Sequence, residues 1–181
     1  MLHKRIFTSV IAIVTAISLA GFAFAKTPAE LNDLEIAHVA YTADVIDIRY
    51  AHLALAISKN PAIHDFANTM IRDHSTVNDL ALALLKKLKV NAKDNFLSQQ
   101  LNNGADGLVD EMSRLKGKDF DKRYAENELA YHKAVNGLVE NTFIKNIQNA
   151  EVKALFKDAL VIFKAHEVHA EKMVAALQAG N

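Results

Sequence analysis

The sequence contains no cysteine and only two prolines, and both scarcities narrow what the chain can be. Without cysteine there is no disulfide, so the fold depends on its core, and metal sites built from thiolates are excluded. Pro28 and Pro61 each follow a residue that can cap a helix, Thr27 or Asn60, so both are expected near helix starts. No stretch alternates convincingly between apolar and polar residues, and no sheet is predicted.

The chain also has no excess of positive or negative charge. The 21 Lys and Arg residues balance the 21 Asp and Glu residues, and the sequence pI is about 7.1. This balance argues against nucleic acid as a partner and against polybasic attachment to a membrane. A nucleophile motif and a phosphate-binding loop are absent as well, which disfavours an enzyme and leaves any catalytic residues unknown.

The first 25 residues have the layout of a secretory signal peptide. A basic start at residues 3–5 precedes an apolar run over 6–20, and Ala23-Phe24-Ala25 supplies the small residues that a signal peptidase reads. The apolar run is shorter than the roughly 20 residues that span a bilayer, which disfavours an uncleaved anchor. We therefore predict a signal peptide at 1–25, a mature domain at 26–181 without a transmembrane span, and export to the periplasm or cell envelope.

The mature part is expected to be one all-α domain. Apolar residues recur at helical spacing, one stripe per helix, over four stretches: 28–58, 61–88, 119–148 and 150–178. A weaker helix is expected at 94–115, where Gly104 and Gly107 interrupt the pattern. Four helices that each bury one stripe are typical of a four-helix bundle around a shared core.

The lengths of the connections favour a ferritin-like order of these helices. The first two and the last two long helices are joined by turns so short that each pair must be antiparallel neighbours. A helix over 94–115 would reach ~33 Å, most of the length of the bundle. This length favours up-down-down-up connectivity with a helical crossover, while simple up-down-up-down connectivity stays open.

An ionisable residue interrupts the apolar stripe of each long helix: Asp47, His74, His132 and His166. The first two are equally far from the turn at 60–61, and the last two are equally far from Asn149. At 1.5 Å per residue, the pairs lie ~20 Å and ~26 Å from their turns, which places both near the middle of the bundle. With up-down-up-down connectivity their heights would differ by only ~6 Å. The four side chains are therefore expected to meet in either topology.

Three imidazoles and a carboxylate match a divalent transition-metal site in ligand type and number. We expect one such metal, with zinc, copper and iron not distinguished by the spacing. Glu128 and His169, one turn from His132 and His166, are additional candidate ligands or groups that orient the imidazoles. The alternative is a buried network of hydrogen bonds between histidine and aspartate that only fixes the packing of the helices.

Several short motifs resemble a bacterial family of exported proteins of unknown function. They are DIRYAHLAL at 47–55, FANTMIRDH at 66–74, FDKRY at 120–124 followed by His132, and Ala165-His166 in the last helix. Members of that family are commonly labelled outer-membrane or periplasmic proteins and are grouped with ferritin-like domains. The resemblance implies a ferritin-like fold and an envelope location, and it supplies no established activity.

The chain departs from di-iron proteins at the positions that matter most. Those proteins place Glu-x-x-His on two of their helices, whereas Ile71 and Phe163 stand three residues before His74 and His166 here. A ferroxidase or di-iron oxygenase site is therefore not expected, and a site for one ion fits better.

Three functions remain open from the sequence. The first is a periplasmic metal-binding protein that serves sequestration, delivery or envelope stress protection. The second is a structural or adaptor bundle of the cell envelope with an architectural polar layer, and the third, less favoured, is a metal-dependent enzyme. The sequence identifies no protein partner, and it is compatible with a homo-oligomer.

Overall fold

The computed structural model describes residues 26–179, whose regular elements are all helices and include no strand. The predicted signal peptide at 1–25 lies outside these described residues. The elements are η1 (Pro28–Glu30), α1 (Asp33–Ile57), α2 (Pro61–Leu88), α3 (Phe96–Met112), α4 (Gly117–Leu138), the π-helical turn η2 (Val139–Phe143), α5 (Ile144–Asn146) and α6 (Ala150–Ala179). None of the described helices combines the length and the apolar character needed to cross a bilayer.

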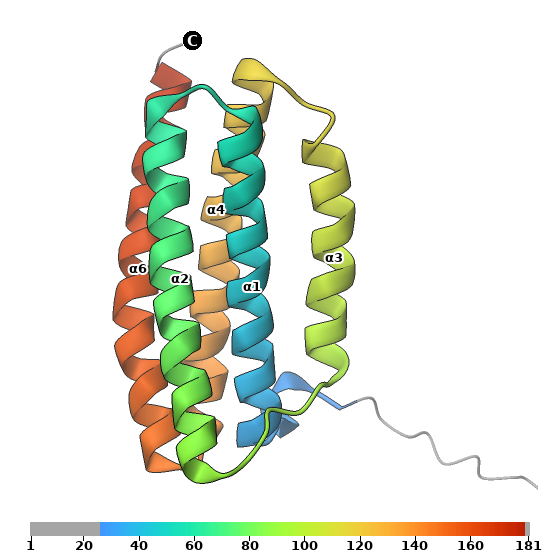
Figure 1. Cartoon of the computed structure of the whole chain (residues 1–181), viewed down its shortest axis with the longest axis vertical. Coiled ribbons are helices and arrows are strands. Elements are labelled where there is room, and N and C mark those ends of the chain that lie inside the picture. Colours follow the sequence, from blue (N-terminus) through green and yellow to red (C-terminus); the bar gives the residue numbers. More distant parts are fainter. Residues whose placement is uncertain (1–25, 180–181) are drawn as a thin grey trace, which may run out of the picture.

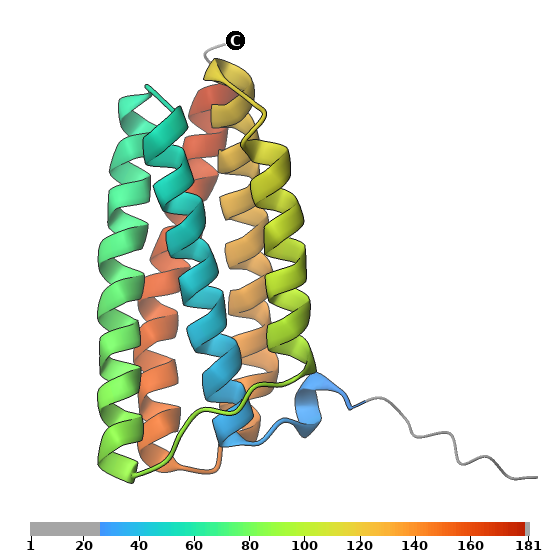
Figure 2. The ribbon, with the colours of Figure 1, turned by 45° about the vertical axis from the view of Figure 1, so that its right-hand side comes forward.

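Four helices lie side by side, and a fifth packs against their outside (Figure 1). Around the group, α1 contacts α2, α2 contacts α6, α6 contacts α4, and α4 contacts α1. Helices α1 and α6 run in one direction, and α2 and α4 run in the other. Helix α3 lies against α1 and carries the chain back along the length of the other helices to the start of α4 (Figure 2). The stretch expected to be a weak helix at 94–115 is therefore this outer helix.

Asparagine side chains begin four of the long helices. Asn32, Asn60 and Asn95 accept hydrogen bonds from backbone N–H groups in the first turns of α1, α2 and α3, and Asn149 does the same for α6. These bonds satisfy N–H groups that have no partner inside the helix. Helix α4 begins differently, at Gly117, whose φ of 55° is a backbone conformation that favours glycine.

Two expected helices differ from the observed elements at one end. The helix expected from residue 28 is a short 3-10 turn followed by α1, because Asn32 and Glu35 form their own capping box and fix the start of α1 at Asp33. The helix expected at 119–148 changes to π-helical bonding at Val139–Phe143. That wider turn keeps Val139 and Phe143 buried together beside the start of α1 and the start of α6.

The apolar core consists of two large clusters, one toward each end of the group of helices. One cluster contains Phe66, Tyr124 and Met173, and the other contains Ile36 and Phe156. On all four inner helices the residues of one cluster precede those of the other along the chain. The histidines of α2, α4 and α6 lie between the two clusters, and on α1 Asp47 directly follows Ile46 at their border. The fold thus places a polar layer between two apolar cores.

The cap at Asn149 gives a test of how α6 begins. Asn149 Oδ1 accepts hydrogen bonds from the N–H groups of Glu151 and Val152 at 2.9 and 3.1 Å, so Asn149→Ala leaves both without that partner. We expect the substitution to lower the free energy of unfolding by about 1 kcal/mol, measured by urea denaturation. Asn103→Ala, at an exposed position inside α3, is the matched control and should leave stability unchanged or slightly higher. Equal losses in both variants would contradict the assigned cap.

Candidate metal centre

The polar layer brings together side chains from all four inner helices. Asp47 comes from α1, His74 from α2, Glu128 and His132 from α4, and His166 from α6. Asp47 and Glu128 are 0% exposed, and the three histidines are 3 to 4% exposed. Ionisable groups this far from water require partners, because each would otherwise lose its hydration without compensation.

The four residues that the sequence places at one height are in mutual contact. Asp47 Oδ2 lies 3.0 Å from His74 Nε2 and 3.4 Å from His132 Nε2. The imidazole centroid of His166 lies 5.4 Å from that of His74 and 5.5 Å from that of His132. The three imidazoles therefore surround one small region, and Asp47 borders it from α1.

Aspartates on α1 and α2 hold two of the imidazoles in place. His74 Nδ1 lies 2.8 Å from Asp44 Oδ1, and His166 Nε2 lies 2.9 Å from Asp73 Oδ2. In a neutral imidazole the nitrogen that donates to a carboxylate carries the proton, so the other nitrogen carries the lone pair. When the imidazoles are neutral, the two aspartates thereby leave the lone pair on His74 Nε2 and on His166 Nδ1.

His132 is held in the same way by the backbone. Its Nδ1 donates to the carbonyl oxygen of Glu128, one turn earlier on α4, at 2.9 Å. His132 Nε2 and His166 Nδ1 have no hydrogen-bond partner among the described residues, and His74 Nε2 lies 3.0 Å from Asp47 Oδ2. Metal-binding histidines in proteins have the same arrangement, with one nitrogen bonded to an acceptor and the other on the metal.

The two carboxyl groups of the layer are also without hydrogen-bond partners. Within residues 26–179, Asp47 Oδ1 and both oxygens of Glu128 make no hydrogen bond, whereas Asp47 Oδ2 lies at ion-pair distance from the imidazoles of His74 and His132. Buried polar atoms without partners cost several kcal/mol each, so native proteins rarely leave them so. A cation between these oxygens and the free imidazole nitrogens would satisfy them all.

Candidate ligand atoms fall into two overlapping groups. One consists of His74, His132 and His166 and the other of Asp47, Glu128 and His132, with atoms within 4.8 Å of one another in each group. Ligands at ~2.1 Å from a tetrahedral ion lie about 3.4 Å apart, close to the Asp47–His132 separation. A cavity of about 10 Å³ lies against Asp47, His74 and His132, which is room for roughly one water-sized species. The residues present therefore fit one small divalent cation.

Charge is distributed unevenly across the layer. Burial favours a higher pKa for Asp47, but His74 and His132 outweigh it and lower the pKa of Asp47 to about 2. Burial favours a lower pKa for His74, but Asp47 and Asp44 outweigh it and raise the pKa of His74 to about 10. In the metal-free protein at neutral pH, His74 is thus an imidazolium between two carboxylates.

The other groups of the layer are neutral in the metal-free protein. Burial lowers the pKa of His132, and it lowers the pKa of His166 to about 4 against the opposing effect of Asp73. Burial and the neighbouring Asp47 raise the pKa of the Glu128 carboxyl well above its usual range. Two imidazoles are therefore ready to bind a metal without losing a proton, whereas His74 must lose one.

The remaining candidate and the other histidines lie elsewhere. His169 is exposed, packs edge-on against Phe66 at 5.0 Å, and belongs to neither group of candidate ligands in the described part of the chain. His38 bonds to Ser98 of α3 at 2.8 Å, and His52 is exposed. Only the histidines in the apolar stripes thus contribute to the layer.

Asp44 and Asp73 are functional candidates that the sequence analysis missed. Asp44 lies three residues before Asp47, a spacing that places both on one face of α1, and this signal was available. Asp73 is adjacent to His74 in the sequence but reaches His166 on α6 instead. No spacing rule predicts that contact, because it depends on how α2 is rotated against α6.

The charge on His74 predicts how the stability of the metal-free protein depends on pH. The pKa of His74 is about 10 in the folded state and near 6.5 when unfolded, so its stabilising effect is complete below ~pH 6.5 and is lost as the pH rises toward 10. We expect the free energy of unfolding, measured by urea denaturation in chelator, to fall over this range. His74→Gln should flatten this decline, and His38→Gln should preserve it. An unchanged slope in His74→Gln would show that His74 is not the titrating group.

Comparisons with known proteins place the chain in a family without identifying an activity. No curated protein and no solved structure matched it. The family match extends over residues 20–173 and so includes every residue of the polar layer and both anchoring aspartates. This chain therefore belongs to the family described as "Domain of unknown function (DUF4142)".

Proposed function

We propose that this protein binds one divalent transition metal through His74, His132, His166 and Asp47, and that it sequesters or delivers that metal in the periplasm or during envelope stress. One observation carries the proposal. Three buried imidazoles from three helices are each held by a hydrogen bond at one nitrogen, and they offer ligand atoms within 4.8 Å of one another. The other nitrogens of His132 and His166 have no partner among the described residues, and that of His74 lies 3.0 Å from Asp47. Nitrogen and carboxylate ligands of this kind suit zinc, copper and iron.

The order of the helices supports a ferritin-like four-helix bundle with up-down-down-up connectivity, in which α3 is the crossover (Figures 1 and 2). Bundles of this kind build metal sites from side chains on facing helices. Here Ile71 and Phe163 take the places that Glu-x-x-His pairs would need, so the proposed centre holds a single ion. Glu128 supplies a second carboxyl group beside Asp47, and once Glu128 loses its proton the two negative charges would neutralise one divalent cation.

A purely architectural polar layer is the second candidate, and one contact favours it. His74 lies 2.8 Å from Asp44 and 3.0 Å from Asp47, so as an imidazolium it can pair with both carboxylates without a metal. One negative charge of the three groups is then left over. Such a layer would fix how α1 and α2 pack and would bind nothing. It does not account for the free nitrogens of His132 and His166, which have no partner in residues 26–179.

Metal titration of the chelator-treated protein tests the proposed function. We expect one equivalent of zinc, copper or ferrous iron to bind, measured by calorimetry, and to raise the melting temperature by mass action. His74→Ala and His166→Ala should each abolish the metal-dependent rise, and the matched variants His38→Ala and His52→Ala should retain it. If none of the three metals shifts the melting temperature of the unsubstituted protein, the layer is architectural.

The anchoring aspartates give a finer prediction that leaves every ligand in place. Asp44→Asn and Asp73→Asn remove the carboxylates that orient His74 and His166, and we expect each to weaken metal affinity about 10–100-fold. Asp106→Asn, which alters an exposed ion pair with Arg49, is the control and should not change affinity. Unchanged affinity in both layer variants would mean that the aspartates do not orient ligands.

The proposed location has its own test. The signal-peptide pattern predicts that protein recovered from the periplasm begins at Lys26, which intact-mass measurement can establish. Retention of residues 1–25 in that material would show an anchored protein instead, and recovery in the cytoplasm alone would contradict export.

A further inference from the structure

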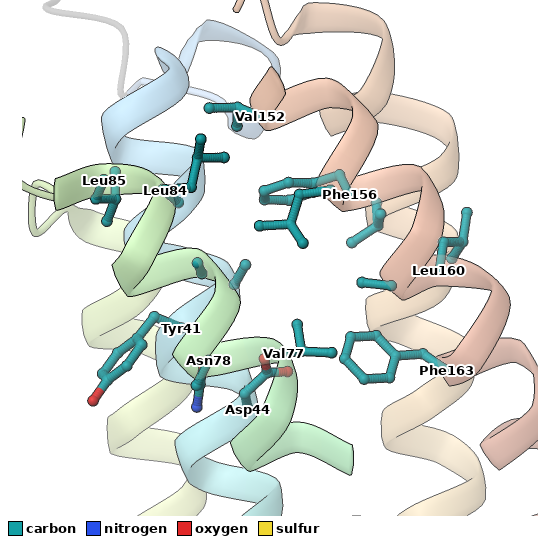
Figure 3. Close-up of a pocket in the computed structure, with 16 residues that line it drawn as sticks. Tyr41, Asp44, Val77, Asn78, Leu84, Leu85, Val152, Phe156, Leu160 and Phe163 are labelled. Carbon is teal, nitrogen blue, oxygen red and sulfur yellow. The ribbon is translucent and has the colours of Figure 1, made fainter. Parts of the chain in front are cut away.

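An apolar cleft lies between α2 and α6 next to the polar layer (Figure 3). Phe156 and Phe163 extend from α6 toward α2, and Val77 of α2 extends toward Phe163. The cleft has a volume of about 50 Å³, and nearly all of its lining residues are apolar. It is separate from the smaller cavity at the candidate ligands, although Asp44 and Phe163 border both.

Small side chains keep this cleft open. Ala81 on α2 and Ala159 on α6 line it at positions where larger apolar residues would fill the space between the helices. By the usual measure, 50 Å³ holds about four water-sized groups, less than the roughly 150 Å³ that accepts an aromatic ring. The enclosed space therefore suits about four atoms of an unbranched chain rather than a ring, and the rest of a longer chain must extend out of the open side of the cleft.

One end of the cleft carries hydrogen-bond acceptors. Asn78 is 7% exposed, and its Oδ1 has no partner within the described residues. Asp44 lies at the same end (Figure 3), and its Oδ1 accepts from His74 while the carboxylate retains capacity for a further donor. An occupant that satisfies both side chains needs donors at one end, and the negative charge of Asp44 favours a cationic one.

The same end of the cleft is lined by two residues that also contact a candidate metal ligand. The ring of Phe163 stacks on the imidazole of His74, with centroids 4.4 Å apart and an angle of 11° between the planes. Asp44 accepts a hydrogen bond from Nδ1 at the edge of the same imidazole. A molecule that contacts Phe163 and Asp44 therefore acts on both groups that orient His74.

We propose that the cleft is a binding site for a short, unbranched aliphatic amine, whose chain packs between Val77 and Phe156 and whose ammonium group donates to Asp44 and Asn78. The hydrocarbon lining supplies the affinity for the chain, and the two acceptors determine which end lies deepest. This site is distinct from the proposed metal site and does not require that a metal be bound.

Titration of the metal-free protein with n-hexylamine tests the proposal directly. We expect saturable binding, with amide chemical-shift changes in nuclear magnetic resonance spectra concentrated at residues 77–85 of α2 and 156–163 of α6. Sodium n-hexanoate has the same chain with a negative head, and n-hexanol has the same chain with a neutral one. Hexanoate should bind at least tenfold more weakly than the amine, and hexanol should lie between them. Equal binding of all three would overturn the assigned role of Asp44 and Asn78.

Two variants that fill the cleft test where the amine binds. Ala159→Leu and Ala81→Leu place bulk in the cleft from opposite helices, and each should weaken hexylamine binding more than tenfold while circular dichroism stays helical. If one of them fails to fold, the other retains the test. Ala165→Leu, at an exposed position of α6 outside the cleft, is the matched control and should bind as the unsubstituted protein does. Unchanged affinity in a folded filling variant would show that the amine binds elsewhere.

A second measurement tests whether binding in the cleft and binding of the metal are coupled, and it rests on the proposed function. Saturating hexylamine should change the affinity for zinc, and zinc should change the affinity for hexylamine by the same factor. Loss of zinc binding with intact hexylamine binding would refute the proposed function alone. Intact zinc binding without hexylamine binding would refute the cleft site alone.

Discussion

Asp47 and the two imidazoles next to it set the constraint that the rest of the molecule satisfies. Asp47 is fully buried, and its Oδ2 lies 3.0 Å from His74 and 3.4 Å from His132. A carboxylate so far from water is tolerable only if positive charge is close by, and that charge comes from a different helix. Helices α1, α2 and α4 must therefore meet at this height, and the apolar clusters on either side keep water out of the contact.

The metal-free and metal-bound states would differ in the group that supplies this positive charge. In the metal-free state the proton on His74 supplies it, which accounts for a pKa of about 10 for a buried imidazole. A divalent metal at the same place would displace that proton and also occupy the free nitrogens of His132 and His166. The fold can thus exist without metal and still present ligands that are already oriented. Asp44 belongs to both the layer and the cleft, which is why a molecule in the cleft would act on His74.

Much of this arrangement follows from the sequence, for a physical reason. A helix rises by a constant amount per residue, so the equal spacing of Asp47 and His74 from the turn at 60–61 places them at one height. The apolar stripes then indicate which histidines face inward, and His38 and His52, which do not interrupt a stripe, lie outside the layer.

The details that were not predicted depend on contacts between helices. His169 is one turn from His166, but Ala170 and Met173 take the buried positions there, and His169 remains exposed. The bond from His166 to Asp73 depends on the rotation of α2 relative to α6, and spacing along one helix carries no such information. The π-helical turn after α4 is likewise a response to packing at the end of the molecule, and periodicity alone predicted a continuous helix there.

X-ray absorption spectroscopy of the zinc-loaded protein is the most direct test of the central claim. The account predicts about three imidazole nitrogens and one or two carboxylate oxygens at ~2.0–2.2 Å from the zinc, with one imidazole lost in His166→Ala. A shell of oxygen atoms alone, or a spectrum unchanged by His166→Ala, would show that the metal binds outside the polar layer and would contradict the account.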